Sequence, residues 1–164
     1  MLSLATRGIV FFALTVGSSA LGAQAPIPYG APVTLDAAKR ASAAAIAMAR
    51  EKNWTIAVAI VDPGGILVYF ERMDATQNGS AAVAIDKARS AALFKRPTKW
   101  FHDALAAGGE GWRMLQLQGA VAIDGGIPLV VDGKIVGAIG VSGASSSQDG
   151  QAAQAGVDAV SRGN

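Results

Sequence analysis

The stretch DGGIPLVVDGKIVGAIGVSGA, residues 124–144, contains the strongest fold signal in this chain. Two apolar runs, 127–131 and 134–141, flank the dipeptide Asp132-Gly133. Asp-Gly between β-branched runs is typical of a type I′ turn, because both central residues of that turn take positive φ. The stretch therefore predicts a β-hairpin. Since both arms are almost wholly apolar, we expect both faces to be covered and the hairpin to lie centrally in its sheet.

The rest of the chain predicts helices around this hairpin. Thr34 is a favourable N-cap for an alanine-rich helix that ends near residue 52. The turn Asp62-Pro63-Gly64-Gly65 joins two expected strands, 54–61 and 66–72. Further elements are expected as helices at 80–94, 99–107 and 146–161 and as a short strand at 120–123. Because the hairpin links are too short for crossovers, we expect a largely antiparallel sheet and an α+β domain.

Composition narrows the class of protein. The chain has 164 residues, 51% hydrophobic and 16% charged, which suits one domain with a substantial core. Its 14 basic and 12 acidic residues give a net charge of +2, and no basic block interleaves with aromatics, so nucleic-acid binding is not expected. The absence of cysteine excludes disulfides, thiolate metal sites and cysteine nucleophiles.

The first 25 residues resemble a signal peptide with its cleavage region. Arg7 precedes an apolar run at 9–16, and small residues follow at 17–25. The apolar run is short for a membrane span, so no stable span is expected after cleavage, although an uncleaved anchor or a mis-assigned start is the alternative. We therefore expect a periplasmic or secreted protein with a Pro-rich leader at 26–32 and one domain at 33–162.

His102 is the only histidine. It is a candidate axial haem ligand or general base, and the alternative is a surface helix residue beside Asp103. Near His102 in the sequence are three aromatic residues and a methionine: Trp100, Phe101, Trp112 and Met114. Such an apolar-aromatic region is expected to form part of the core, an oligomer contact or a wall for a flat ligand.

Glycines recur at 137, 140 and 143 without the dinucleotide fingerprint G-x-G-x-x-G or a phosphate-binding loop. The spacing around Ser142 also lacks the G-x-S-x-G nucleophile pattern. Two interpretations stay open for Ser142 and Gly143. Either a helix packs closely over a glycine-bearing strand, or these residues and the serines before the last helix form an anion site for a carboxylate or propionate.

The first hairpin gathers charged residues: Asp62, Glu71, Arg72 and Asp74. A metal site made from these carboxylates would contain no histidine. A turn aspartate together with a structural Arg–carboxylate pair is the favoured interpretation.

Three runs resemble a known family: VAIVDPGGILVYFERMDA (58–75), KARSAALFKRPT (87–98) and GGIPLVVDGKIVGAIGVSGASSSQD (125–149). They are similar, in the same order, to the GlcG/HbpS-type haem-binding family, also called the haem-degrading domain. The opening VTLDAAKRASAAA (33–45) resembles the first helix of that family. The resemblance covers about residues 33–161.

This resemblance implies a profilin-like sandwich with an antiparallel five-stranded sheet and flanking helices. It also implies a homo-oligomer and, for some members, haem binding, with roles in haem or iron handling or in oxidative stress. One type of haem ligand in related domains is a histidine of the first helix, and the expected helix 35–52 contains none. The remaining candidates for a haem site are His102, Arg96, Thr98 and the weaker ligands Met73, Met114 and Tyr69, with Arg72 or Arg96 on a propionate.

Three functions are therefore considered. The leading hypothesis is an exported homo-oligomer that binds haem or another tetrapyrrole. The second is an enzyme or binding protein for a small carboxylated metabolite, with Ser142 and Gly143 and either Arg72 or Arg96 as its anion site. The third is a structural or accessory homo-oligomer without a ligand.

Overall fold

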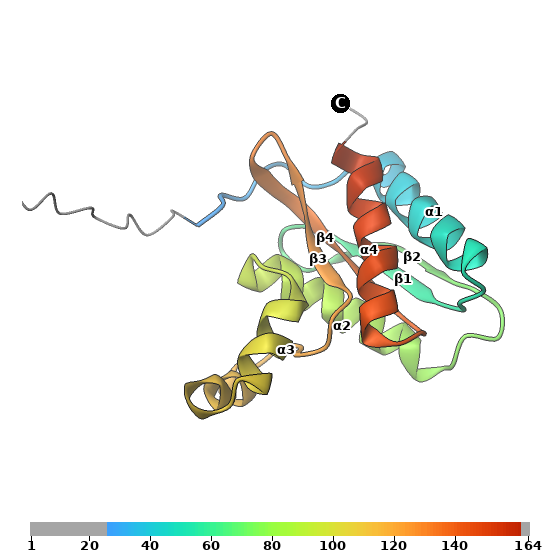
Figure 1. The fold of residues 1–164 in the computed structure, drawn as a ribbon. Helices are drawn as coiled ribbons and strands as arrows, with labels where there is room; N and C mark the ends of the chain where they lie inside the picture. Colours follow the sequence, from blue (N-terminus) through green and yellow to red (C-terminus); the bar gives the residue numbers. More distant parts are fainter. Residues whose placement is uncertain (1–25, 162–164) are drawn as a thin grey trace, which may run out of the picture.

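A four-stranded antiparallel sheet separates two layers of helices in the computed structural model, which describes residues 26–161 (Figure 1). The strand order is β2-β1-β4-β3. The strands are β1 (Ala57–Val61), β2 (Leu67–Arg72), β3 (Gly126–Val131) and β4 (Lys134–Ser142). At the turn between β3 and β4, φ is 49° for Asp132 and 70° for Gly133. The predicted hairpin is therefore confirmed, with the positive φ values that Asp-Gly favours.

The central position expected for the hairpin holds for only one of its arms. β4 pairs with both β1 and β3, whereas β3 is an edge strand. Pro128 lies within β3 and has no N–H to offer a further strand, which suits an edge. The apolar sequence of β3 reflects helices on its two faces and does not reflect two neighbouring strands.

The expected strand at 120–123 is absent, so the described residues form a sheet of four strands and not five. The backbone N–H of Val121 donates to the hydroxyl of Ser90 at 3.0 Å and not to a strand. Gly119 precedes it with φ of 80°, a conformation that interrupts an extended run. The residues before this segment form η1 (Gly109–Gln116), a 3-10 helix.

One face of the sheet packs against α1 (Leu35–Glu51) and α4 (Ser146–Ser161). Thr34 caps α1 as predicted, because its hydroxyl accepts a hydrogen bond from the N–H of Ala37 at 3.2 Å. Isoleucine and valine side chains of the sheet meet the alanines of α1 in this layer. Burial of these side chains is the main stabilising contribution on this face.

The other face of the sheet carries small side chains and packs against α2 (Gly79–Phe94). Ala57, Ala59 and Ala138 meet alanines of α2 there. A Cβ at Gly140 would collide with the carbonyl oxygen of Ala84. The helix backbone therefore lies directly over the strand, which confirms close packing as the reason for this glycine.

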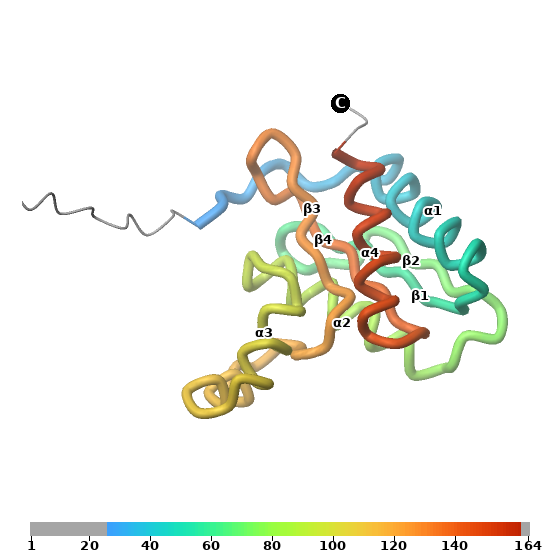
Figure 2. Tube along the Cα trace, in the orientation of Figure 1, coloured from blue at the N-terminus to red at the C-terminus, as the bar shows by residue number. Residues whose placement is uncertain are grey.

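Residues 98–123 form an arm that extends beyond the sheet, as Figures 1 and 2 show. The arm begins with α3 (Thr98–Ala106) and continues through η1. At the other side, the leader runs extended along β4, where Gly30 N–H donates to the carbonyl of Ile135 at 2.8 Å. Between residues 26 and 161, no helix is long and apolar enough to cross a membrane. The predicted signal peptide with its cleavage region, 1–25, and the predicted end of the domain at residue 162 lie outside the described part, as do residues 163 and 164.

Candidate functional site

A cleft of about 390 Å³ lies between the start of α3, the start of β3 and the first turns of α4. Its walls include Pro97, Lys99, Asp124, Ile127, Ser147 and Gln151. The volume falls within the range of small-molecule sites, about 300–1,000 Å³. Lys99 and Asp124 bring opposite charges to this cleft beside the apolar side chains of Pro97 and Ile127, so it can contact both apolar and ionic groups of a ligand.

His102 follows Lys99 by about one helical turn on α3 and is not among the residues that line this cleft. Asp103 bridges the two residues: its carboxylate accepts from Lys99 Nζ at 2.6 and 2.8 Å and lies 3.2 Å from His102 Nδ1. The Nε2 atom of His102 has no partner among the described residues, and the side chain is half-exposed. Hydrogen bonds from Lys99 and then His102 hold the pKa of Asp103 below its ordinary value, and the bond to Asp103 raises the pKa of Lys99.

The predicted aromatic region divides into a buried and an exposed part. Phe101 is buried and meets the edges of Phe94 and Trp100, with ring centroids 5.3 and 5.2 Å apart. Trp100 is 45% exposed and carries the guanidinium of Arg96 at 4.2 Å from its ring centre. Arg96 is oriented by this cation–π contact and by a hydrogen bond from its Nε to the carbonyl of Phe94 at 3.1 Å, and it precedes Pro97, which lines the cleft.

Thr98 begins α3, but its side chain is inaccessible to a ligand. Its side chain is fully buried, and its hydroxyl accepts a hydrogen bond from the N–H of Gly126 at 2.9 Å. The helix expected at 99–107 begins one residue earlier, because Thr98 is the first residue of α3 and Pro97 precedes it. Thr98 fastens the arm to β3.

Arg72 is separated from the other predicted site residues. It ends β2 at one edge of the sheet, whereas Thr98 contacts β3 at the opposite edge. Three strand spacings of about 4.8 Å put these positions roughly 14 Å apart. Arg72 donates to Asn78 Oδ1 at 2.9 Å, while Glu71 accepts from Ser42 and Tyr69, so Arg72 does not form the expected Arg–carboxylate pair with any described residue.

The carboxylates of the first hairpin do not form a metal centre in the described part of the chain. No group of three or more His, Asp or Glu side chains there is arranged to hold an ion. Asp62 instead caps its own turn, accepting from the N–H groups of Gly64 and Ile66 at 2.8 and 2.9 Å. The turn-aspartate interpretation of Asp62 is therefore confirmed.

Of the two interpretations for Ser142 and Gly143, the structure favours close packing. Ser142 is buried at the end of β4, and a Cβ on Gly143 would collide with the carbonyl oxygen of Thr55. The N–H of Ala144 donates to Asp149 at 3.0 Å, so a carboxylate of the chain itself already occupies the expected anion site. An added carboxylate or propionate would have to displace Asp149.

The sequence patterns did not predict the buried ion pair between Lys87 and Asp149. Lys87 Nζ lies 2.8 Å from Asp149 Oδ2 and donates to the carbonyl of Val141 at 2.9 Å. Both side chains are at most 3% exposed. Burial raises the pKa of Asp149, while Lys87 and the Ala144 N–H oppose that shift. The available signal was the position of Lys87 on the helical stripe that otherwise carries the alanines of α2.

Comparisons with known proteins agree with this fold. The family described as "Haem degrading protein HbpS-like" matches residues 33–158. Protein GlcG of Escherichia coli K12 is 38% identical over 94 residues, which are 57% of this chain and 69% of GlcG. Identity to GlcG therefore extends across much of the domain.

Two solved structures give the same result in three dimensions. A double mutant of HbpS from Streptomyces reticuli has a TM-score of 0.72 and 28% identity, with 96% of each chain covered. The PduOC:haem complex has a TM-score of 0.70 and 27% identity, covering 78% of this chain and 94% of PduOC. The chain belongs to the HbpS-like haem-degrading protein family.

Proposed function

We propose that this protein is an exported, homo-oligomeric protein that binds haem or another tetrapyrrole in haem or iron handling or in the response to oxidative stress. Its family and the similarity to PduOC, which was solved with haem, support haem binding. The proposed haem site is the cleft beside α3.

The geometry of His102 carries the proposal. A histidine that ligates a metal usually has its second ring nitrogen bound to a carboxylate or carbonyl, which fixes the orientation of the ring. His102 has this arrangement: Nδ1 faces Asp103, and Nε2 is free of partners in the described structure. It is the only histidine of the chain, so it is the one imidazole available to haem iron.

The surroundings of His102 also suit a porphyrin. Lys99 lines the cleft and Arg96 lies close by on Trp100, so two cations are available to carboxylate groups of a ligand. Ile127 and Pro97 supply apolar wall. A small carboxylated metabolite would use the same cations without His102, which distinguishes the second candidate function by experiment.

Titration of the purified protein with haemin, followed by absorbance, tests the proposal. We expect a saturable shift of the Soret band that His102→Ala weakens or abolishes. Asp86→Ala, a change at an exposed position of α2, serves as the matched control and is expected to titrate like the parent.

The outcomes separate the candidates. A saturable shift that survives in His102→Ala would contradict this axial ligand while retaining haem. The absence of a saturable shift would contradict haem binding, and thermal protection by organic acids that depends on Lys99 would then favour the carboxylated metabolite.

Export is the part of the proposal that depends on residues 1–25. A charged residue, an apolar run and a zone of small residues support it. Mass spectrometry of the secreted or periplasmic form should find a start near Gln24. A chain that keeps Met1 in the membrane fraction would contradict export.

A further inference from the structure

A second hollow, of about 290 Å³, lies at the end of β2, at the opposite edge of the sheet from β3. Its lining consists of four charged residues and one methionine: Arg50, Glu71, Arg72, Met73 and Asp74. Arg50 belongs to the last turn of α1, and the others are consecutive residues at the end of β2 and just after it. Two guanidinium groups and two carboxylates therefore border one small space.

These four charges do not pair with one another. In the described part of the chain, no ion pair joins either arginine to either carboxylate. Arg72 donates instead to the neutral amide of Asn78, and Glu71 Oε2 accepts from hydroxyl groups. The side chains of Arg50 and Asp74 bond to no described residue. Opposite charges that border one hollow in this way are available to a ligand that carries both signs of charge.

The backbone that carries these charges is fixed by the fold. Arg50 lies on α1, whose buried face is part of the core. The turn that carries Asp74 is fastened to the carbonyl of Ile56, which accepts from the N–H of Met73 at 3.0 Å and from the hydroxyl of Thr76 at 3.2 Å. Preorganisation of this kind reduces the entropy that a ligand loses on binding.

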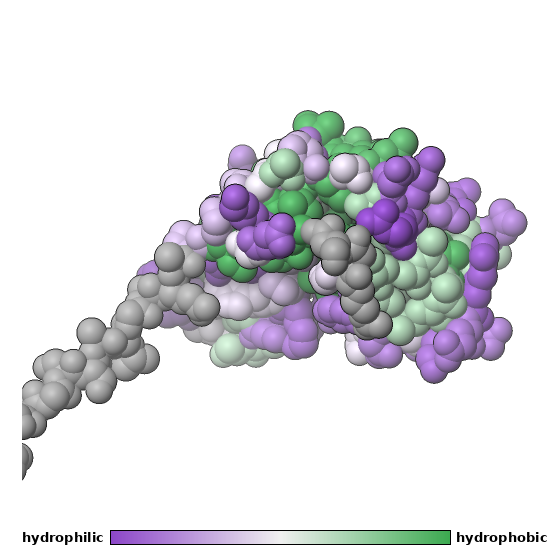
Figure 3. Space-filling model, turned by 90° about the horizontal axis from the view of Figure 1, so that it is seen from above, coloured by the Kyte–Doolittle hydropathy of each residue, from purple (hydrophilic) through white to green (hydrophobic). Residues whose placement is uncertain are grey.

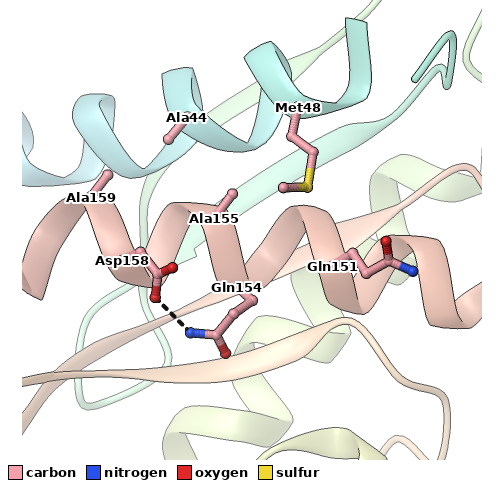
Figure 4. Close-up of a pocket in the computed structure, with 7 residues that line it drawn as sticks. All are labelled: Ala44, Met48, Gln151, Gln154, Ala155, Asp158 and Ala159. Carbon is pink, nitrogen blue, oxygen red and sulfur yellow. Dashed lines mark hydrogen bonds between the residues drawn. The ribbon is translucent and has the colours of Figure 1, made fainter. Parts of the chain in front are cut away.

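The larger hollow of about 540 Å³ between α1 and α4 lacks this combination of charges. Figure 4 shows Ala44 and Met48 of α1 facing α4 across it. Asp158 is the one charged residue in its lining, and its carboxylate accepts from Gln154 at 2.8 Å. That hollow therefore has no pair of opposite charges with which to orient a ligand.

We propose that the hollow at the end of β2 binds a free α-amino acid with an apolar side chain. The carboxylate of this ligand accepts hydrogen bonds from Arg50 and Arg72, and its ammonium group lies against Glu71 and Asp74. Met73 supplies the apolar contact for the ligand side chain. This site is separate from the haem site of the proposed function and adds a second ligand to it.

The mixture of charges disfavours other small ions. A phosphate or a dicarboxylate would bring further negative charge against Glu71 and Asp74, and a divalent cation would meet two guanidinium groups. Among residues 26–161, no group of three or more His, Asp or Glu side chains is arranged to hold a metal. The hollow is slightly smaller than the range of about 300–1,000 Å³ for drug-sized ligands, so it suits a molecule with few heavy atoms.

Isothermal titration calorimetry of the purified protein with three matched probes tests this proposal. The probes are L-leucine, isocaproate, which lacks the amino group of L-leucine, and isoamylamine, which lacks its carboxylate. We expect saturable binding of L-leucine and at least about tenfold weaker binding of each of the others. Each partial analogue leaves two like charges of the hollow without a counter-charge.

Two substitutions locate the site. Arg50→Gln and Asp74→Asn each remove one charge from an exposed side chain without a bond, so both variants should melt like the parent. We expect each to weaken L-leucine binding by about tenfold or more. Arg40→Gln is the matched control, because Arg40 is an exposed arginine of α1 about 15 Å from Arg50 along the helix, and it should bind L-leucine like the parent.

Each contrary result overturns a stated part of the proposal. No saturable binding of L-leucine or L-alanine, by heat or by thermal protection, would overturn it entirely. Isocaproate that binds as tightly as L-leucine would replace the amino-acid site with an anion site. Unchanged L-leucine affinity in both variants would exclude this hollow. Arg50→Gln should titrate with haemin like the parent, so haem binding and amino-acid binding succeed or fail separately.

Discussion

Two lysine–aspartate pairs of nearly equal length lie in opposite environments. Lys87–Asp149 spans 2.8 Å in the body, between α2 and α4, and its side chains are 1% and 3% exposed. Lys99–Asp103 spans 2.6 Å on the arm, and its side chains are 58% and 54% exposed. The buried pair therefore joins α2 to α4 out of contact with water, whereas the exposed pair lies where solvent screens it.

The apolar surface follows the same division. In the body, alanines and glycines bring helix backbone onto the sheet, and the core side chains are almost wholly inaccessible. On the arm, tryptophan and leucine side chains face outward. Figure 3 views the molecule from above the orientation of Figure 1, and the face turned towards the reader carries apolar areas bordered by hydrophilic ones. The body is therefore closely packed, whereas the arm leaves large apolar side chains exposed.

The largest effect is expected from a substitution that breaks the buried pair Lys87–Asp149. Lys87→Met should lower the free energy of unfolding by about 3–5 kcal/mol, because it leaves the buried carboxylate of Asp149 without its cation. The matched change on the arm, Lys99→Met, should leave the unfolding midpoint almost unchanged. Denaturant titration of both variants measures the difference. Equal losses in the two variants would contradict the comparison.

A double variant sharpens this result. Lys87→Met with Asp149→Leu removes both charges together, and apolar replacement of a buried pair is often neutral or stabilising. Recovery of much of the lost stability would assign the single-variant effect to the uncompensated carboxylate.

A smaller effect is expected from filling the space between α2 and the sheet. Gly140→Val should lower the free energy of unfolding by about 1–3 kcal/mol, because its side chain would collide with the backbone of Ala84. Gly133→Val is the control: nothing lies within 4 Å of its Cβ, but φ of 70° should still cost about 1–2 kcal/mol. Thermal melting compares the two, and only Gly140→Val should also disturb packing of α2, detected by hydrogen exchange.

The smallest effect concerns protonation on the arm. The pKa of Asp103 lies below its ordinary value of 3.8, because Lys99 and then His102 donate to its carboxylate. Its contribution to stability is therefore present above pH 3.8 and is lost as the pH falls through the lower folded-state value. NMR titration of the carboxyl carbon should show this pKa rise towards 3.8 in Lys99→Met. An unchanged pKa would contradict the bridge between Lys99 and His102.

Local sequence patterns predicted most of the fold. The Asp132-Gly133 turn and the cap at Thr34 depend on neighbouring residues alone, and both are present. The strand at 120–123 was wrong because a short apolar run does not specify a partner, and Val121 bonds to Ser90 of α2 instead. The edge position of β3 was also missed, since apolar residues report covered faces and not neighbouring strands.

The candidate site was predictable only in part. His102, Asp103 and Lys99 are close in sequence, so helical spacing alone brings them together. The burial of Thr98, the separation of Arg72 and the cleft between α3 and α4 depend on contacts between distant segments. A sequence pattern identifies such residues by type, but their accessibility follows from packing.

The sequence by itself determined the α+β class, the hairpin, the helices and the family, because these depend on periodicity, turn chemistry and matching runs. Only the tertiary structure decided that Asp149 fills the expected anion site, that Lys87 is buried against it, and that the arm leaves Trp112 and Leu115 uncovered. The physical reason is that burial and pairing are properties of segments brought together from far apart in the chain, which no local pattern specifies.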